Sequence, residues 1–385
     1  MHRFPRAAAL ASAEPPTAAT PALRHRRALF AALVTLTVAV MTALMAATLS
    51  RGGFGLLDLA LTLCFLLTLP WTVVGFWNAV IGLTLLRLTP DPVGAVCPAA
   101  RSVRGDEPLT SSTALLVCVR NEDAATVARN LEVMLQGIVD AGVEAHFHAY
   151  ILSDSTWPDA VAEEEREIGR LQDRWRGILP VAYRRRDDNA GYKAGNIRDF
   201  CERWGRDHDF ALVLDADSLM ATDAMLRLVR VMQANPRVGI LQSLVVGMPT
   251  VSTFARVFQF GMRLGMRSYT LGSAWWQGDC GPYWGHNALI RLEPFTRHCD
   301  LPRLPGGPPL GGWVLSHDQV EAVLMRRAGY EVRVLPEECG SWEENPPTLL
   351  EFIRRDLRWC QGNMQYWRLL HLPGLRPVSR VQLLL

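Results

Sequence analysis

Lysine is almost absent from this chain of 385 residues. Of its 40 basic residues only Lys193 is a lysine, so arginine supplies the positive charge nearly everywhere else. A generic surface lysine could have been an arginine like the others, which makes Lys193 a candidate functional residue. The alternative is that this one lysine is retained by chance. With 40 basic against 38 acidic residues, the chain also lacks the charge excess that drives binding to nucleic acids and other polyanions.

Two further patterns are missing. The eight cysteines include no Cys-x-x-Cys pair, so neither a zinc knuckle nor a disulfide framework is indicated, and a reducing compartment is favoured. No Gly-x-Gly-x-x-Gly or P-loop segment occurs, which argues against both kinds of phosphate cradle. Hydrophobic residues make up 49% of the chain and charged residues 20%, and this composition excludes an intrinsically disordered protein.

The hydrophobicity is concentrated in two uncharged runs near the N-terminus. Ala28–Ser50 is long enough, as a helix, to cross a hydrocarbon core of roughly 30 Å, and Leu59–Leu86 is longer still. A short glycine-rich connection makes the two runs a hairpin. The basic stretch 24–27 and Arg87 place both ends in the cytoplasm under the positive-inside rule. A cleaved signal peptide is the alternative, disfavoured because a second run follows at once.

From residue 113 onward, short apolar runs alternate with helical patterns. Four runs are predicted to be buried strands: 114–119, 146–152, 210–214 and 238–241. Such repeats predict a mostly parallel sheet covered by helices. Because ligands of these sheets bind at the carboxyl ends of the strands, Asp154, Asp215 and Asp217 are expected on one edge.

Asp215 and Asp217 form a D-x-D pair directly after a predicted strand. Two carboxylates this close repel each other in a dry cleft unless a cation lies beside them. Oxygen ligands of this kind suit Mg²⁺ or Mn²⁺, which would bridge to a substrate phosphate. A solvated loop is the alternative, but the preceding strand and the lone lysine upstream favour a site.

Two further groups of polar residues lie at predicted helix starts. Lys193 and Asn196 open one helix, and a helix N-terminus that carries a cation and an amide suits a diphosphate or a sugar hydroxyl. An ordinary helix start is the alternative there. Asp318 precedes another helical run, where it can be the N-cap and also a general base. The residues alone do not separate it from His317 as the base.

The segment 347–370 combines aromatic and aliphatic side chains with arginines, and it contains Trp359 and Gln361. Such a basic, aromatic helix is typical of a helix lying along a membrane surface, with an amphipathic core helix as the alternative. The final residues, 380–385, begin another apolar run, so we expect a longer protein of which this chain is a part.

Six short sequence motifs follow one another between about residues 113 and 367. They are RNED at 120–123, YILSDS at 150–155, VLDADS at 213–218, YWGHNA at 283–288, LSHD at 315–318 and RWCQGN at 358–363. As a set they resemble the processive family 2 glycosyltransferases, the group of cellulose and hyaluronan synthases. The likeness is greatest to the branch that builds the backbone of osmoregulated periplasmic glucans. One segment departs, since Met364 and Gln365 stand where the family's Q-x-x-R-W motif has arginine and tryptophan.

The resemblance implies an α/β domain of GT-A type behind a two-helix transmembrane hairpin. It implies an inverting hexosyltransferase that takes glucose from UDP-glucose, uses Mg²⁺ or Mn²⁺ and elongates a β-glucan acceptor, with β-1,2 linkages in this branch. The expected location is a bacterial inner membrane, multi-pass, with the catalytic domain in the cytoplasm. The lipid bilayer and a periplasmic glucan-processing protein are the further implied partners, and nucleic acid is not.

The same resemblance implies a role for each candidate residue. Asp154 would contact the uridine, while Lys193 and Asn196 would hold donor phosphate or sugar. Asp215 would lie near the diphosphate and, with Asp217, ligate the metal. Asp318 would be the general base. The residues implied for the acceptor or sugar site are Trp284, His286, Asn287, Trp359 and Gln361.

The expected organisation has five parts: a disordered basic cytoplasmic tail (1–27), two transmembrane helices (28–87), a linker (88–112), the GT-A domain (113–345), and an interface helix followed by the start of a further membrane region (346–385). Two rival functions stay open. One is a family 2 transferase with another sugar donor or a lipid acceptor. The other is a membrane-anchored regulator that binds a nucleotide sugar without turnover, against which the intact Asp215, Asp217 and Asp318 argue.

Overall fold

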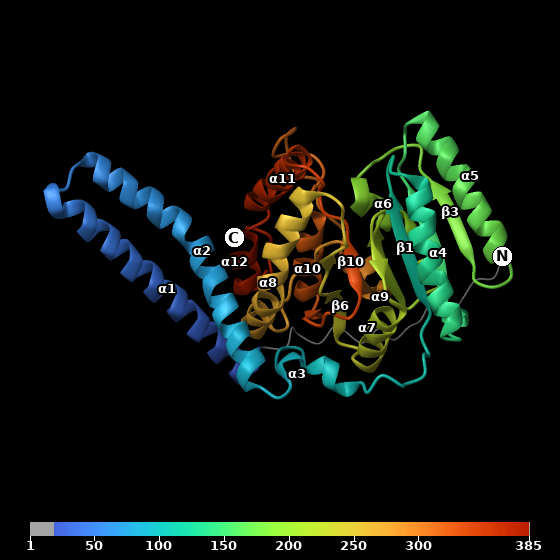
Figure 1. Cartoon of the computed structure of the whole chain (residues 1–385), viewed down its shortest axis with the longest axis horizontal. Coiled ribbons are helices and arrows are strands. Elements are labelled where there is room, and N and C mark those ends of the chain that lie inside the picture. Colours follow the sequence, from blue (N-terminus) through green and yellow to red (C-terminus); the bar gives the residue numbers. More distant parts are fainter. Residues whose placement is uncertain (1–18, 385) are drawn as a thin grey trace.

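The computed structural model describes residues 19–384. Two long helices, α1 (Pro21–Leu49) and α2 (Leu56–Leu88), project from the body of the molecule as a hairpin (Figure 1). By length and composition each could cross a membrane, as predicted. Residues 21–27 of the predicted tail are already helical, and residues 1–18 of that tail lie outside the described part.

The rest of the chain is an α/β domain with two sheets, entered through two short helices, α3 (Pro92–Val96) and η2 (Pro98–Ser102). The main sheet has the order β3-β2-β1-β4-β8-β6-β9, and only β8 runs antiparallel to its neighbours. Its strands are β1 (Thr113–Val119), β2 (Phe147–Ser153), β3 (Val181–Arg185), β4 (Phe210–Asp215), β6 (Val238–Ser243), β8 (Ala288–Arg291) and β9 (Glu331–Leu335). The small sheet joins β5 (Leu219–Met220), β10 (Ser341–Glu343) and β7 (Val246–Gly247).

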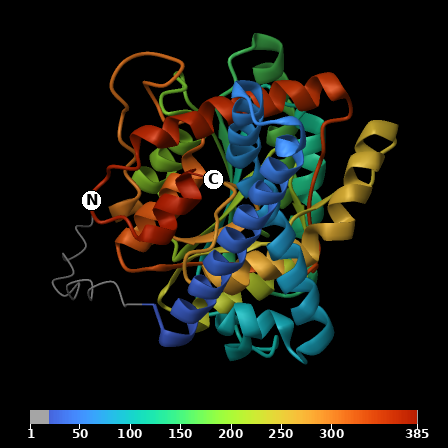
Figure 2. The same ribbon diagram turned by 90° about the vertical axis from the view of Figure 1, so that its left-hand side faces the viewer.

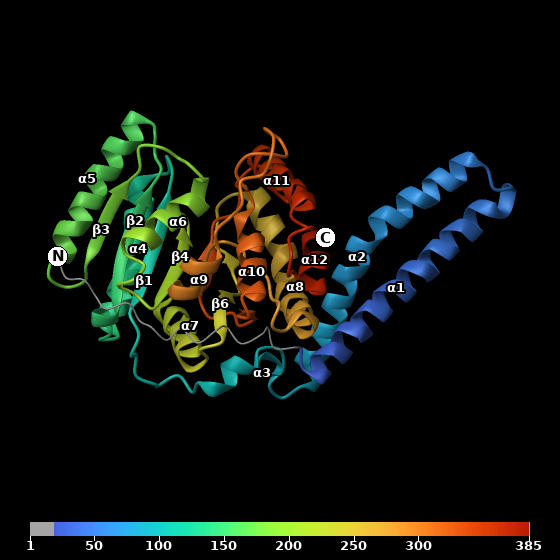
Figure 3. The same ribbon diagram turned by 180° about the vertical axis from the view of Figure 1, so that it is seen from behind.

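Helices cover both faces of the main sheet (Figures 1 and 3). One core layer lies under α4 (Ala124–Asp140), α5 (Pro158–Trp175) and α7 (Thr222–Ala234). The other lies under α6 (Tyr192–Arg203), α9 (Leu292–His298) and α10 (His317–Arg327). Because β1 and β4 are buried on both faces, their side chains are apolar without alternation, which is the pattern from which the sequence predicts them.

All four strands predicted from apolar runs are present, as β1, β2, β4 and β6. The prediction of a mostly parallel sheet between helices is confirmed. The chain then continues through α8 (Thr253–Gln277), α11 (Leu349–Met364), the 3₁₀ turn η4 (Gln365–Arg368) and α12 (Pro377–Leu384). The eight cysteines are all free, in agreement with their spacing.

The hairpin is held to the α/β domain by close packing of α2 on α8 (Figure 2). A Cβ atom at Gly272 would lie 1.8 Å from the backbone oxygen of Asn78, so only glycine permits this approach of the two helices. Trp276 donates a 3.0 Å hydrogen bond from its indole nitrogen to the Asn78 side chain and stacks on Phe30. Arg27, at the start of α1, pairs with Asp279 at 2.7 Å.

Replacing Gly272 with alanine should therefore separate α2 from α8. We expect Gly272→Ala to lower the melting temperature of the detergent-solubilised protein, because overpacking of this kind costs about 1–3 kcal/mol. Gly261→Ala on the same helix is the matched control, since its added Cβ meets no atom within 4 Å. Equal melting temperatures for the two variants would show that the close approach does not hold the hairpin.

Candidate active site

The carboxyl ends of β2, β1 and β4 lie next to one another, and we call this edge of the main sheet the rim. In the parallel register, Ser153 is opposite Val119 and Asp215 is opposite Cys118. Asp154 and Asp215 therefore mark the ends of the strands that flank β1. The rim expected from the sequence is present.

Lys193 lies in the first turn of α6 and reaches across to β4. Its Nζ donates hydrogen bonds to Asp215 Oδ1 and, at 2.7 Å, to the backbone oxygen of Gly285. Burial alone would lower the pKa of Lys193, but the Asp215 carboxylate raises it above its usual value. Burial alone would raise the pKa of Asp215, and Lys193 lowers it. Both groups are therefore charged at neutral pH.

A second charged group surrounds His286. Its Nε2 lies 2.6 Å from Glu343 Oε2, and its Nδ1 lies 3.7 Å from Asp215 Oδ2. Burial alone favours the neutral ring, but the hydrogen bond with Glu343 and the charge of Asp215 raise the pKa of His286 to about 9. Glu343 belongs to the small sheet, and no pattern in the sequence marked it as a functional residue.

Among the carboxylates at the rim, Asp217 has the least positive charge close to it. Its burial and the charges of Asp215 and Glu343 raise its pKa to about 6. Within residues 19–384 the structure gives it no ion pair. Negative charge is therefore concentrated at Asp217, which is the condition under which a bound cation is favourable.

The residues at the rim fit a divalent cation only if the substrate completes its coordination. Within residues 19–384 no three His, Cys, Asp or Glu side chains form a metal-binding group. Mg²⁺ and similar ions are commonly held by one or two carboxylates together with water and substrate phosphates. Because Asp215 Oδ1 is engaged by Lys193, Asp217 is the better-placed ligand of the two.

Asp154 is buried and paired on both oxygens with Arg186, at 2.7 Å each. Arg186 also donates to the backbone oxygens of Ala190 and Tyr192, at 3.1 Å each. The pair therefore fixes the loop that leads from β3 into Lys193. Arg186 was not among the candidate residues from the sequence, since an arginine in an arginine-rich chain carries no distinguishing signal.

Asn196 and Asn287 are buried, and most of their polar atoms are bound to protein. Asn196 donates to Leu152 O at 2.9 Å and accepts from Arg184 at 2.6 Å. Asn287 donates to Ser341 Oγ at 3.0 Å and so joins β8 to the small sheet. These contacts favour a structural role for both side chains over the predicted contacts with donor or acceptor.

Asp318 lies half-buried in the first turn of α10. Its predicted N-cap position is wrong, because Ser316 is the N-cap residue and α10 begins at His317. A Cβ at Gly285, whose φ is +81°, would lie 3.4 Å from Asp318 Cβ, so Asp318 packs against the turn that accepts a hydrogen bond from Lys193. The helix dipole favours a carboxylate at this position.

The last two candidates, Trp359 and Gln361, lie on α11. Trp359 is 48% exposed, and the guanidinium of Arg355 stacks over its ring at 4.3 Å. Gln361 donates a 3.4 Å hydrogen bond to Pro309 O. Burial lowers the pKa of Arg355 while Glu343 and Asp217 oppose that shift, which places Arg355 near the acidic residues. Arg355 was missed, and its spacing of one helical turn from Trp359 is the signal that could have found it.

Gln365 stands where the family's Q-x-x-R-W motif has tryptophan, and it has a defined structural role. Gln365 is buried in η4, accepts a hydrogen bond from Leu315 N at 2.8 Å and donates to Trp313 O at 3.1 Å. It therefore fixes the chain that leads into α10 and Asp318.

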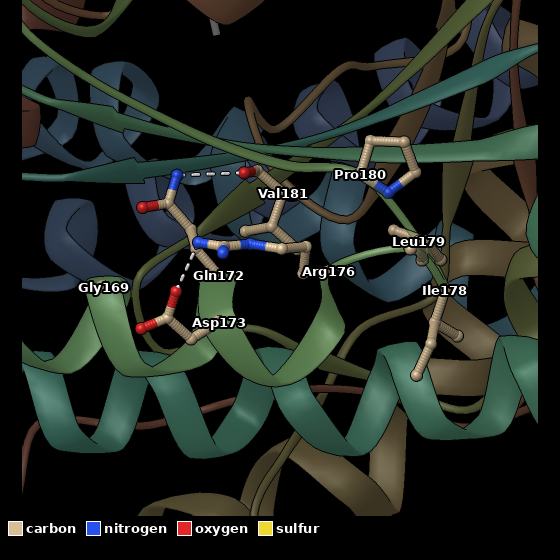
Figure 4. A pocket seen from close by; sticks show the side chains of 9 residues that line it. Gly169, Gln172, Asp173, Arg176, Ile178, Leu179, Pro180 and Val181 are labelled. Atoms are coloured by element: carbon tan, nitrogen blue, oxygen red, sulfur yellow. Dashed lines mark hydrogen bonds and ion pairs between the residues drawn. The ribbon is translucent and has the colours of Figure 1, made fainter.

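A cavity lies away from these residues. It measures about 700 Å³ and is formed where the end of α5 turns into β3, beside Gln172 and the ion pair of Asp173 with Arg176 (Figure 4). This is the amino end of β3, whereas the rim lies at the carboxyl ends of the strands. The cavity is separate from the candidate active site.

Comparison with known proteins places these residues in a family. Residues 210–385 match the model described as Glycosyl transferase family group 2. The chain carries a family 2 glycosyltransferase domain. It is 39% identical over 346 residues to glucans biosynthesis glucosyltransferase H of Xylella fastidiosa (strain 9a5c), an alignment that covers 90% of this chain and 54% of that protein.

The same likeness extends to other bacteria. Identity is 42% over 328 residues with glucans biosynthesis glucosyltransferase H of Klebsiella pneumoniae (strain 342), covering 84% of this chain and 38% of that protein. The chain thus spans about half or less of the length of these curated relatives. Together with the sheet and the two apolar helices, the match confirms the predicted family and its GT-A fold class.

Among solved structures, the chain is similar to the mannosyltransferase PcManGT from Pyrobaculum calidifontis, solved in complex with GDP-Man and Mn²⁺. The identity is 16%, the TM-score is 0.45, and the superposition covers 80% of this chain and 79% of that one.

Proposed function

We propose that this chain is the catalytic part of a membrane glucosyltransferase that transfers glucose from UDP-glucose to a growing β-glucan. The observation that carries the proposal is the convergence of Lys193, Asp215 and Asp318 on the Gly285 turn, within a family 2 glycosyltransferase domain. The names of the relatives supply the sugar and the product, a glucan. For the linkage we retain β-1,2, as the sequence resemblance implies.

The reaction is a single displacement at the anomeric carbon. Asp318 accepts the proton of an acceptor hydroxyl as that oxygen attacks C1 of the glucose on the face opposite UDP. The bond from C1 to the diphosphate oxygen breaks, and UDP leaves with the electron pair. The configuration inverts, so an α-linked donor yields a β-linked product. A base in hydrogen-bond reach contributes roughly 10²- to 10⁴-fold to such a step.

Positive charge on the donor side stabilises the departing diphosphate. Lys193 and the N-terminus of α6 supply this charge from the protein. A divalent cation, Mg²⁺ or Mn²⁺, held at Asp217 would add charge stabilisation of the same leaving group. The paired Asp154 and Arg186 border the place we assign to the uridine.

The acceptor side is assigned to the loop before β8 and to α11. Trp284 and His286 lie on that loop, and Trp359 and Gln361 lie on α11. His317 is less suitable as the base than Asp318, because its ring is buried and its Nδ1 is bonded to Glu321. A different sugar donor, a lipid acceptor, or a regulator that binds without turnover are the competing assignments.

We propose that the hairpin of α1 and α2 lies in the lipid bilayer. Seen from the hairpin side, α8 and α11 both face the viewer (Figure 2). Both carry exposed apolar side chains, such as Phe260 and Leu264 on α8 and Leu357 on α11. These exposed side chains support the prediction that α11, in the segment 346–385, is an interface helix beside the catalytic domain of residues 113–345. The flanking arginines support a multi-pass inner-membrane enzyme with a cytoplasmic site, whose product would meet a periplasmic glucan-processing protein.

Substitution of the proposed metal ligand tests the cofactor. We expect Asp217→Asn to lower cation-dependent UDP release from UDP-glucose by about 100-fold or more, because an amide is a poor ligand for a hard cation. UDP release is measured in membranes with Mg²⁺, with Mn²⁺ and with excess chelator. Asp173→Asn, on the exposed surface of α5, is the control. Wild-type rates in the Asp217 variant, or full activity in chelator, would contradict the assignment.

Substitution of the proposed base tests the mechanism. Asp318→Asn leaves the Ser316 N-cap intact, so we expect normal UDP-glucose affinity. Transfer should nevertheless fall by roughly 10²-fold or more, because the amide cannot accept the acceptor proton. Both quantities are measured in the same membranes, with His317→Gln in parallel. Near-native transfer by Asp318→Asn together with loss in His317→Gln would move the base to His317.

A further inference from the structure

Next to Asp318, α10 carries a buried ionisable pair that the proposed reaction does not use. His317 Nδ1 lies 2.8 Å from Glu321 Oε2, one helical turn further on. The two side chains are 9% and 3% exposed. A buried carboxylate is costly unless it is paired, and His317 is the partner that the described part of the chain gives to Glu321.

The pair shares a packing surface with Asp318. A Cβ at Gly285 would lie 3.8 Å from His317 Cε1 and 3.4 Å from Asp318 Cβ, so both side chains contact the same turn. The Ser316 side chain makes no capping hydrogen bond, which leaves the start of α10 without that restraint. The bond from His317 to Glu321 therefore ties the first turn of α10 to the second on its buried side.

Charged groups face His317 from several elements. On α10 they are Glu321 and Asp318, and from the surrounding elements they are Lys193 of α6 and Asp215 of β4. The neutral hydroxyls of Tyr283 and Tyr366 lie near the carboxylates of Glu321 and Asp318. Burial alone favours the neutral ring, but Glu321 and Asp318 raise the pKa of His317 above its usual value against the effect of Lys193. The imidazolium is thus present below this raised pKa and is lost as the pH rises through it.

Tyr283 lies near Glu321 and Asp318, and it cannot supply a positive charge because a phenol is either neutral or anionic. It is fully buried, and within residues 19–384 its hydroxyl has no hydrogen-bond partner. Burial and the nearby carboxylates raise its pKa well above the usual value, so the phenol stays neutral. Within residues 19–384, His317 is the basic side chain paired with Glu321.

We propose that the His317–Glu321 pair positions the Asp318 carboxylate for catalysis. Protonated His317 holds the first turn of α10 against the Gly285 turn and balances the negative charge of Glu321 and Asp318. The inference rests on the proposed function, in which Asp318 is the base. His317 acts through Asp318 and is a positioning residue, so its loss affects turnover and not donor binding.

The test compares Glu321→Gln and His317→Asn with the wild-type protein in membranes. We expect kcat for UDP release to fall about 10- to 100-fold, with KM for UDP-glucose unchanged within about twofold, because small misplacements of a reacting group have effects of this size. In the wild type we expect kcat to fall at alkaline pH as His317 loses its proton. This fall should occur at lower pH in Glu321→Gln, because His317 has lost the carboxylate that raises its pKa. His317→Asn keeps an N–H donor for Glu321 but cannot titrate, so this fall should disappear.

Glu331→Gln is the matched control. Glu331 pairs with Arg333 at 2.6 Å on β9, away from the rim, and its variant should keep the wild-type kcat and pH profile. Wild-type protein that releases no UDP would overturn both the proposed function and this inference. An active wild type with an unchanged kcat and pH profile in Glu321→Gln would overturn the inference alone. If Glu321→Gln does not accumulate, an unchanged kcat in His317→Asn has the same meaning.

Discussion

The ion pair between Lys193 and Asp215 is the interaction on which the rest of the candidate site depends. It joins the start of α6 to the end of β4, and the second hydrogen bond of Lys193 attaches both to the Gly285 turn. Since Asp318 packs on the same turn, one lysine brings together three segments distant in sequence. An arginine, with its broad planar fork, would not replace this compact cation.

The charges around this pair are arranged unequally. Asp154 pairs with Arg186, Asp215 with Lys193 and Glu343 with His286, whereas Asp217 has no ion pair within residues 19–384 and its pKa is raised to about 6. A free protein in this state is prepared for a cation together with an anionic donor. Another acidic side chain is paired in the same way on α10, where Glu321 is bonded to His317 beside Asp318. The carboxylates around Asp217 and Asp318 are thus paired with basic side chains.

A strand could be predicted from the sequence where nearly all of its side chains are apolar. The strands β1 and β4 are almost entirely apolar because both faces are covered, so they were predicted, as was the position of Asp154 and Asp215 at one edge of the sheet. The strands β3 and β9 were not, because their half-exposed residues include arginines. The partners of the site residues were also missed: Glu343 meets His286, and Arg186 meets Asp154, only through the topology of the sheets. Ser316, not Asp318, caps α10 because the helix starts earlier than its apolar pattern does.

The central claim is that this domain transfers glucose from UDP-glucose on the cytoplasmic side of a membrane. Its most direct test is UDP release from a panel of UDP-sugars by sealed membrane vesicles of both orientations, with linkage analysis of the product. We predict release with UDP-glucose in inverted vesicles, which expose the cytoplasmic face, together with a β-linked glucan, and little release in right-side-out vesicles. Release with a different UDP-sugar only, or only in right-side-out vesicles, would contradict the account.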